Sequence, residues 1–123
     1  LGDALRMAQN QILGKYGEDL AAQYLVDRGY EIVARNWRCS IGEIDLVALH
    51  QGRYVFVEVK TRNGTAFGHP FEAITANKVL RMRRLVAQWC QQNEKAGAKV
   101  RLDAIAVLVR GGKVAVEHLK QVF

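Results

Sequence analysis

The stretch GEIDLVALHQGRYVFVEVKTR, at positions 42–62, decides the fold because it has the pattern of two β-strands joined by a tight turn. Its two halves, 43–49 and 54–61, are rich in β-branched, aliphatic and aromatic residues, which favour strands. Between them, Gln51 and Gly52 suit a two-residue loop, since Gly readily adopts a positive φ. The sequence therefore predicts a β-hairpin.

Charged side chains fall at matching positions of this predicted hairpin. A two-residue loop at Gln51 and Gly52 places Asp45 opposite Glu58 and Glu43 opposite Lys60. Because side chains alternate across a strand, all four lie on one face, at the end away from the turn. The other face is apolar, as expected of the middle of a sheet that helices cover.

The paired acids indicate a metal site. Side chains directly opposite each other in a hairpin have Cβ atoms about 4.5–5.5 Å apart, so Asp45 and Glu58 need a cation to stay ionised together. Oxygen ligands suit Mg²⁺ or Mn²⁺, and Lys60 is placed to meet a substrate phosphate or an attacking water. The alternative is a ladder of opposite charges that only ties the hairpin together.

Composition and charge narrow the class of protein. The 123 residues are half apolar and predict one globular domain. A net charge of +6 points to a polyanionic partner, although a generic basic surface has the same charge. Cys39 and Cys90 are too few for a disulfide framework, and no apolar run is long enough for a membrane helix. We expect a cytoplasmic protein with no membrane segment.

The first helix is predicted at 15–28, where apolar residues recur at helical spacing until Gly29. Residues 1–13 are predicted to form an N-terminal arm, and 14–123 a single domain. Glu18 lies beside the apolar stripe of this helix. It is either a favourable charge near the helix N-terminus or a third acid for the hairpin site.

The second helix is predicted from Thr75, a suitable N-cap, to about Asn93. Its early turns carry several basic residues, including Lys78 and Arg81. They form either a solvated face or a surface that contacts phosphates. The preceding segment, 63–70, contains two Gly and the one Pro, and is expected to be a loop near the substrate entrance.

Three more strands complete the predicted sheet, at 30–38, 100–109 and 113–118. The strand at 100–109 should lie parallel to 54–61, because a long helical crossover separates them. Asp103 interrupts this strand, and we expect it to hold the strand to a basic neighbour.

Five sequence strings resemble a known family: GKYGEDLAAQYL, GEIDLVA, VFVEVKTR, the FEAIT segment with Lys78, and RLDAIAV. They resemble the YraN-type family of small bacterial proteins and, more broadly, the PD-(D/E)xK nuclease superfamily, which includes archaeal Holliday-junction resolvases. The resemblance covers residues 14–116. It implies an α/β fold with a restriction-endonuclease-like core: a central mixed sheet flanked by helices, in the order α-β-β-β-α-β-β.

The resemblance also implies roles for residues. The superfamily motif places its first acid at Asp45, its second at Glu58 and its lysine at Lys60, and resolvase-like members add a helix acid at Glu18. Ile44 stands where the superfamily has a proline. Resolvase-like relatives also imply that a homodimer can form.

The leading hypothesis is a metal-dependent endonuclease that hydrolyses phosphodiesters in DNA, with branched or junction DNA as one substrate class. Asp45 and Glu58 would bind Mg²⁺ or Mn²⁺, with Glu18 and Lys60 assisting. The residues expected to contact backbone phosphates are Arg62, Lys78 and Arg81. The alternatives are a non-catalytic nucleic-acid-binding protein on a nuclease-like fold, and a structural partner protein.

Overall fold

A computed structural model describes residues 2–64 and 68–122. In this part of the chain, a mixed, open five-stranded sheet is flanked by two α-helices. The elements follow the order α1 (Gly2–Asp27), β1 (Glu31–Cys39), β2 (Gly42–His50), β3 (Arg53–Asn63), the short 3₁₀ helix η1 (Pro70–Ala73), α2 (Ala76–Gln92), β4 (Val100–Arg110) and β5 (Lys113–Leu119). The strands lie side by side in chain order, from β1 to β5. The predicted order of helices and strands is confirmed.

The hairpin of β2 and β3 forms around the predicted turn. Gln51 has φ 52° and Gly52 has φ 74°, so both loop residues are in the left-handed region that a tight hairpin turn requires. Next to the turn, His50 pairs with Arg53, and the same register continues to the pair of Leu46 and Val57. The predicted register is therefore correct for this part of the hairpin.

The second half of the fold also matches the expectation. The side chain of Thr75 accepts a hydrogen bond from the backbone N–H of Lys78, and α2 ends at the cap residue Asn93. β4 runs parallel to β3, and β5 returns antiparallel beside it as the edge strand. A crossover that contains a helix lets the chain place two parallel strands next to each other.

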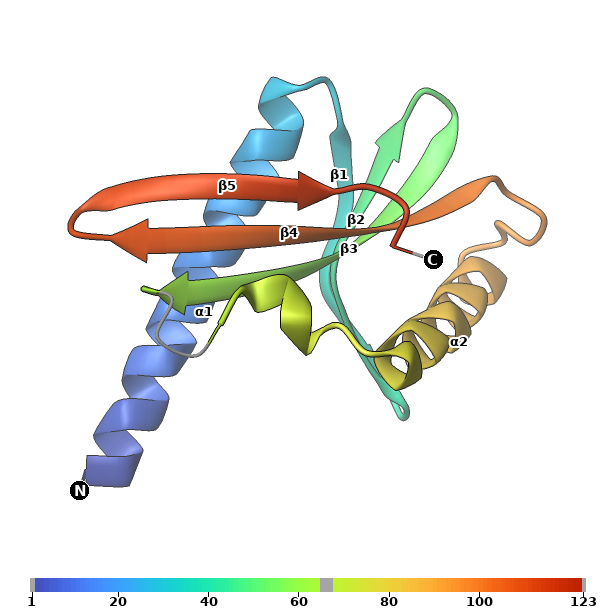
Figure 1. The fold of residues 1–123 in the computed structure, drawn as a ribbon. Helices are drawn as coiled ribbons and strands as arrows, with labels where there is room; N and C mark the ends of the chain where they lie inside the picture. The colour runs from blue at the N-terminus through green and yellow to red at the C-terminus, as the bar shows by residue number, and fades with distance from the viewer. Residues whose placement is uncertain (1, 65–67, 123) are drawn as a thin grey trace.

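The two helices cover opposite faces of the sheet. Ala21 and Leu25 of α1 pack against the face that carries Val57 and Ile105. On the other face, α2 packs against a second cluster, which includes Phe56 of β3. Figure 1 shows α1 passing behind β3, β4 and β5, with α2 on the other side of the molecule.

Helix α1 is longer than predicted. It begins at Gly2 instead of Lys15, and residues 2–13 continue it as one unbroken helix that extends beyond the sheet (Figure 1). Residues 2–12 are all exposed, so their sequence carries no buried stripe from which a helix could be recognised. Their composition, rich in Ala, Leu, Arg, Met and Gln, still favours a helix.

The loop predicted at 63–70 includes residues 65–67, which lie outside the described residues. On its two sides the chain is regular, since Asn63 ends β3 and Pro70 begins η1. Within the described residues, no helix is both long and apolar enough to span a membrane.

Candidate functional site

Strands β2 and β3 separate where the acidic residues begin. Their pairing ends at Leu46 and Val57, whereas β3 stays paired with β4 as far as Asn63. Figure 1 shows the divergence: β1 and β2 extend to their connecting turn at the bottom of the view, while β3 and β4 run to the left. The prediction that Asp45 pairs directly with Glu58 is therefore wrong. Both acids instead line an opening between the two strands.

Asp45 partly closes this opening. Its Oδ2 accepts a hydrogen bond of 2.8 Å from the backbone N–H of Val59, a group that continued pairing with β2 would have satisfied. On the other side of β2, Asn36 lies opposite Asp45, between Arg35 and Trp37, and has the unusual φ of 52°. The sheet is thus irregular around Asp45 on both sides.

This irregularity changes which face Ile44 occupies. Strict alternation predicts that Ile44 shares a face with Leu46. Instead, Ile44 packs in the cluster beneath α2, and Leu46 packs in the cluster beneath α1. Ile44 therefore lies on the face opposite to the one that alternation predicts, because the regular pleat is lost at Asp45.

The ion pairs also differ from the predicted cross-strand pairs. Lys60 Nζ lies 3.2 Å from Glu58 Oε1, on the same strand and the same face. Glu43, predicted to face Lys60, is paired with Arg38 of β1 instead. Once β2 leaves β3, the neighbour of Glu43 is β1, where Arg38 is its direct partner in the register.

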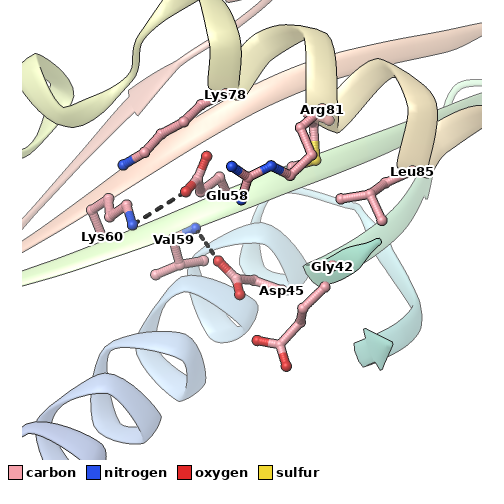
Figure 2. A pocket seen from close by; sticks show the side chains of 10 residues that line it. Gly42, Asp45, Glu58, Val59, Lys60, Lys78, Arg81 and Leu85 are labelled. Carbon is pink, nitrogen blue, oxygen red and sulfur yellow. Dashed lines mark hydrogen bonds and ion pairs between the residues drawn. The ribbon is translucent and has the colours of Figure 1, made fainter. Parts of the chain in front are cut away.

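A pocket of about 420 Å³ occupies the opening. Its floor comes from β2 and β3, and one wall comes from α2 (Figure 2). Figure 2 shows Lys78 and Arg81 extending from α2 over the side of the pocket that holds Glu58 and Lys60, with Asp45 below. The residues that line it are Gly42, Glu43, Asp45, Glu58, Val59, Lys60, Lys78, Arg81, Met82 and Leu85. The structure therefore brings together five of the seven predicted site residues.

The remaining two predicted residues lie outside the lining. Arg62 follows Lys60 on β3, and its guanidinium donates a hydrogen bond to the backbone carbonyl of Thr61. Glu18 lies on α1, close enough for its charge to act on Asp45. Its position depends on the adjacent Gly17, where an added Cβ would lie only 1.8 Å from Thr61 Oγ1. Close packing of α1 on β3 thus holds Glu18 near Asp45.

The surroundings of Asp45 disfavour its ionised form. Burial, the largest effect, raises the pKa of Asp45 from its ordinary value of 3.8 to about 7. The hydrogen bond from Val59 opposes this shift, and the negative charges of Glu18, Glu58 and Glu43 add to it. Burial and the three neighbouring acids therefore disfavour the ionised form of Asp45, and a cation bound next to its carboxylate would offset this effect.

Replacing Asp45 with asparagine should stabilise the metal-free protein at about pH 8 more than at about pH 5. The raised pKa means that the folded chain binds more protons than the unfolded chain between pH 3.8 and about 7, so stability falls as the pH rises through this window. Asparagine keeps an oxygen for Val59 but does not ionise. Melting curves in a chelating buffer measure the effect, and an equal change at both pH values would contradict it.

A second polar cluster surrounds Asp103, which is buried. Arg101 donates two hydrogen bonds of 2.8 Å to its carboxylate, and His118 Nε2 lies 2.7 Å from Oδ2. Arg101 also donates to the hydroxyl of Tyr30, and the backbone N–H of Gln121 donates to Asp103. Burial raises the pKa of Asp103, but these hydrogen bonds outweigh burial and hold the pKa below its ordinary value.

The expected structural role of Asp103 is confirmed, since it ties β4 to His118 of β5 and also binds Arg101 of its own strand. Arg101 could be anticipated, because it lies two positions earlier on the same face of one strand. His118 and Tyr30 could not, because their approach depends on how β5 and the end of α1 pack against β4.

The arrangement of the acidic residues limits how a metal ion could be bound. Among residues 2–64 and 68–122, no group of three or more His, Cys, Asp or Glu side chains is arranged to hold a metal ion. Asp45 and Glu58 are two carboxylates on the same pocket. A Mg²⁺ ion is commonly bound by one or two carboxylates and keeps several waters.

Comparison with known proteins identifies the family. Residues 17–107 match the model of the uncharacterised protein family UPF0102. The chain belongs to this family. A UPF0102 protein of Clavibacter michiganensis is 52% identical over 115 residues, covering 93% of this chain and 98% of that protein. Another, from Beutenbergia cavernae, is 49% identical over 117 residues, covering 94% of this chain and 99% of that protein.

The family match confirms the narrower part of the sequence resemblance, to the YraN-type proteins. The matched segment includes all three acids that line the pocket, Lys60, Glu18 and the whole of α2. The relatives are similar over nearly their full length, so the comparison concerns the complete fold and not an isolated motif.

Proposed function

We propose that this protein is a metal-dependent endonuclease that hydrolyses phosphodiester bonds in DNA. The observation that carries the proposal is the pocket between the diverging strands, where Asp45, Glu58 and Lys60 meet Lys78 and Arg81. Acids suited to a divalent ion thus lie next to cations suited to phosphates. A restriction-endonuclease-like core and membership of the PD-(D/E)xK superfamily are part of this proposal. The motif positions and the order of the elements support both.

The residues present fit a bound Mg²⁺ or Mn²⁺. Asp45 and Glu58 both line the pocket, and the raised pKa of Asp45 arises from burial together with three neighbouring negative charges. Such a site gains stability when a cation neutralises it. Asp45, whose carboxylate Val59 orients, and Glu58 would hold the ion. A bound ion supplies Lewis-acid activation of the phosphate and of a water.

Residues in and next to the pocket have distinct parts in the proposed reaction. Lys60, placed 3.2 Å from Glu58, donates to the attacking water or to the phosphate as negative charge develops on it. The hydrogen bond from Val59 fixes the orientation of the Asp45 carboxylate. Glu18 adds negative charge behind Asp45 and so strengthens attraction for a cation. Lys78 and Arg81 hold backbone phosphates in place without reading the base sequence.

A non-catalytic nucleic-acid-binding protein is the second candidate. It is favoured by the fact that three polar side chains of the pocket have partners within the chain: Lys60 pairs with Glu58, and Asp45 bonds to Val59. In that case, the basic wall formed by α2 binds DNA, and the acids serve only the fold.

Cleavage assays separate the two candidates. Purified protein is incubated with Mn²⁺ and labelled linear, flap and four-way DNA, and the Glu58→Gln variant is the matched control. The nuclease proposal predicts cleavage of at least one substrate by the parent, loss of that cleavage when a chelator is added, and loss in Glu58→Gln. Binding of these DNAs without cleavage would favour the second candidate.

A further inference from the structure

A second groove lies beside the pocket, along the same helix. It has a volume of about 650 Å³ and is lined by Ile41, Arg84, Ala87, Gln88, Gln91 and Gln92. All of these except Ile41, in the turn between β1 and β2, belong to α2. The helix that forms one wall of the pocket therefore also forms most of the adjoining groove.

The polar residues of the two sites lie along one side of α2, which we call the α2 polar track: Lys78, Arg81, Arg84, Gln88, Gln91 and Gln92. Steps of three and four residues bring side chains to the same side of a helix. From Lys78 to Gln92 the helix rises about 21 Å, the length of about six stacked nucleotides of one strand. The sequence of α2 contains four Lys or Arg residues and no Asp or Glu.

The chemistry of the α2 polar track suits a phosphate backbone. Lysine and arginine bind phosphates through charge, and the amide groups of glutamine donate hydrogen bonds to phosphate oxygens. None of the residues lining the groove, all of which the structure describes, is aromatic. Proteins that hold single strands commonly stack bases on aromatic side chains, so this surface suits a duplex.

We infer that duplex DNA lies along α2, with the phosphates of one strand running from the pocket past Arg84 and Gln88. This inference rests on the proposed function and extends it, because it names double-stranded DNA as the substrate class and the direction in which it leaves the pocket. The contacts are to the backbone, so binding is independent of base sequence.

Fluorescence anisotropy with a labelled duplex of about 20 base pairs, longer than the α2 polar track, tests the inference in chelating buffer, where metal-dependent cleavage cannot occur. The Arg84→Ala variant should weaken binding and reduce the slope of log affinity against log salt by about 0.9, the value for one lost phosphate contact. Gln88→Ala should weaken binding with an unchanged slope, because glutamine is uncharged. Arg6→Ala, which removes an exposed arginine on the part of α1 that extends beyond the sheet, should bind like the parent.

A parent-like slope in Arg84→Ala would overturn the inference, as would tighter binding of a single strand of the same length. Melting curves ensure that the variants are folded. The inference and the proposed function can fail separately. If the parent cleaves DNA but Arg84→Ala keeps the parent slope, only the α2 polar track is rejected. If Arg84→Ala shows the slope reduction of one lost phosphate contact but the parent never cleaves, only the nuclease proposal is rejected.

Discussion

Replacing Lys60 with alanine is expected to reduce the single-turnover rate of DNA cleavage by about 100-fold or more, with little change in the binding of DNA or metal. The ammonium group acts mainly when charge develops on the phosphate, so its loss affects the transition state more than the bound substrate. Its ion pair with Glu58 is partly exposed, with 27% and 25% of the two side chains accessible. The loss of stability should therefore stay below about 1 kcal/mol.

Lys78→Ala is the matched control for this experiment, because Lys78 is a second lysine on the same pocket. A lysine that only binds the backbone should lower the affinity for DNA while leaving the rate at saturating DNA near that of the parent. Rates measured over a range of DNA concentrations separate the two effects. Cleavage by Lys60→Ala at the parent rate would remove this lysine from the mechanism.

Replacing Asp103 with alanine is expected to lower the free energy of unfolding by about 3–5 kcal/mol. The carboxylate is fully buried, and its removal leaves the Arg101 guanidinium and the His118 ring without their shared acceptor. It also removes the acceptor for the backbone N–H of Gln121, which holds the C-terminal segment. Urea unfolding at neutral pH measures the change.

Asp19→Ala is the control, since Asp19 forms an ion pair with Arg35 while 51% of its side chain is exposed. An exposed pair contributes about 1 kcal/mol or less, so this variant should be close to the parent. If Asp103→Ala and Asp19→Ala lose the same small amount, the buried cluster does not stabilise the fold as we describe.

The parts of the fold that local chemistry determines could be predicted from sequence. Gln51 and Gly52 suit a turn that needs positive φ at both positions, and Thr75 has the side-chain oxygen that caps a helix. The crossover between β3 and β4 required a parallel pair. In each case, a few adjacent residues or the length of a connection limit the possible geometries.

The divergence of the strands at the site could not be predicted in the same way. Extending the hairpin register assumes that each backbone N–H of β3 that points toward β2 bonds to a backbone carbonyl there, whereas Val59 donates to the side chain of Asp45. A carboxylate that replaces a backbone acceptor does not alter the alternation of apolar residues, so the sequence pattern does not reveal it. The sequence therefore identified the pocket residues but gave the wrong partners for Glu43, Asp45 and Lys60.

The proposed activity depends first on metal binding, and calorimetric titration of the chelator-treated protein with Mn²⁺ tests this most directly. We expect one ion per chain, bound more tightly above about pH 7 than below it, because a proton on Asp45 competes with the ion. Asp45→Asn and Glu58→Gln should each weaken binding by at least about tenfold, while Asp19→Asn, a control at an exposed acid, should not. Mn²⁺ affinity that is unchanged in both pocket variants would contradict the metal site and the nuclease proposal built on it.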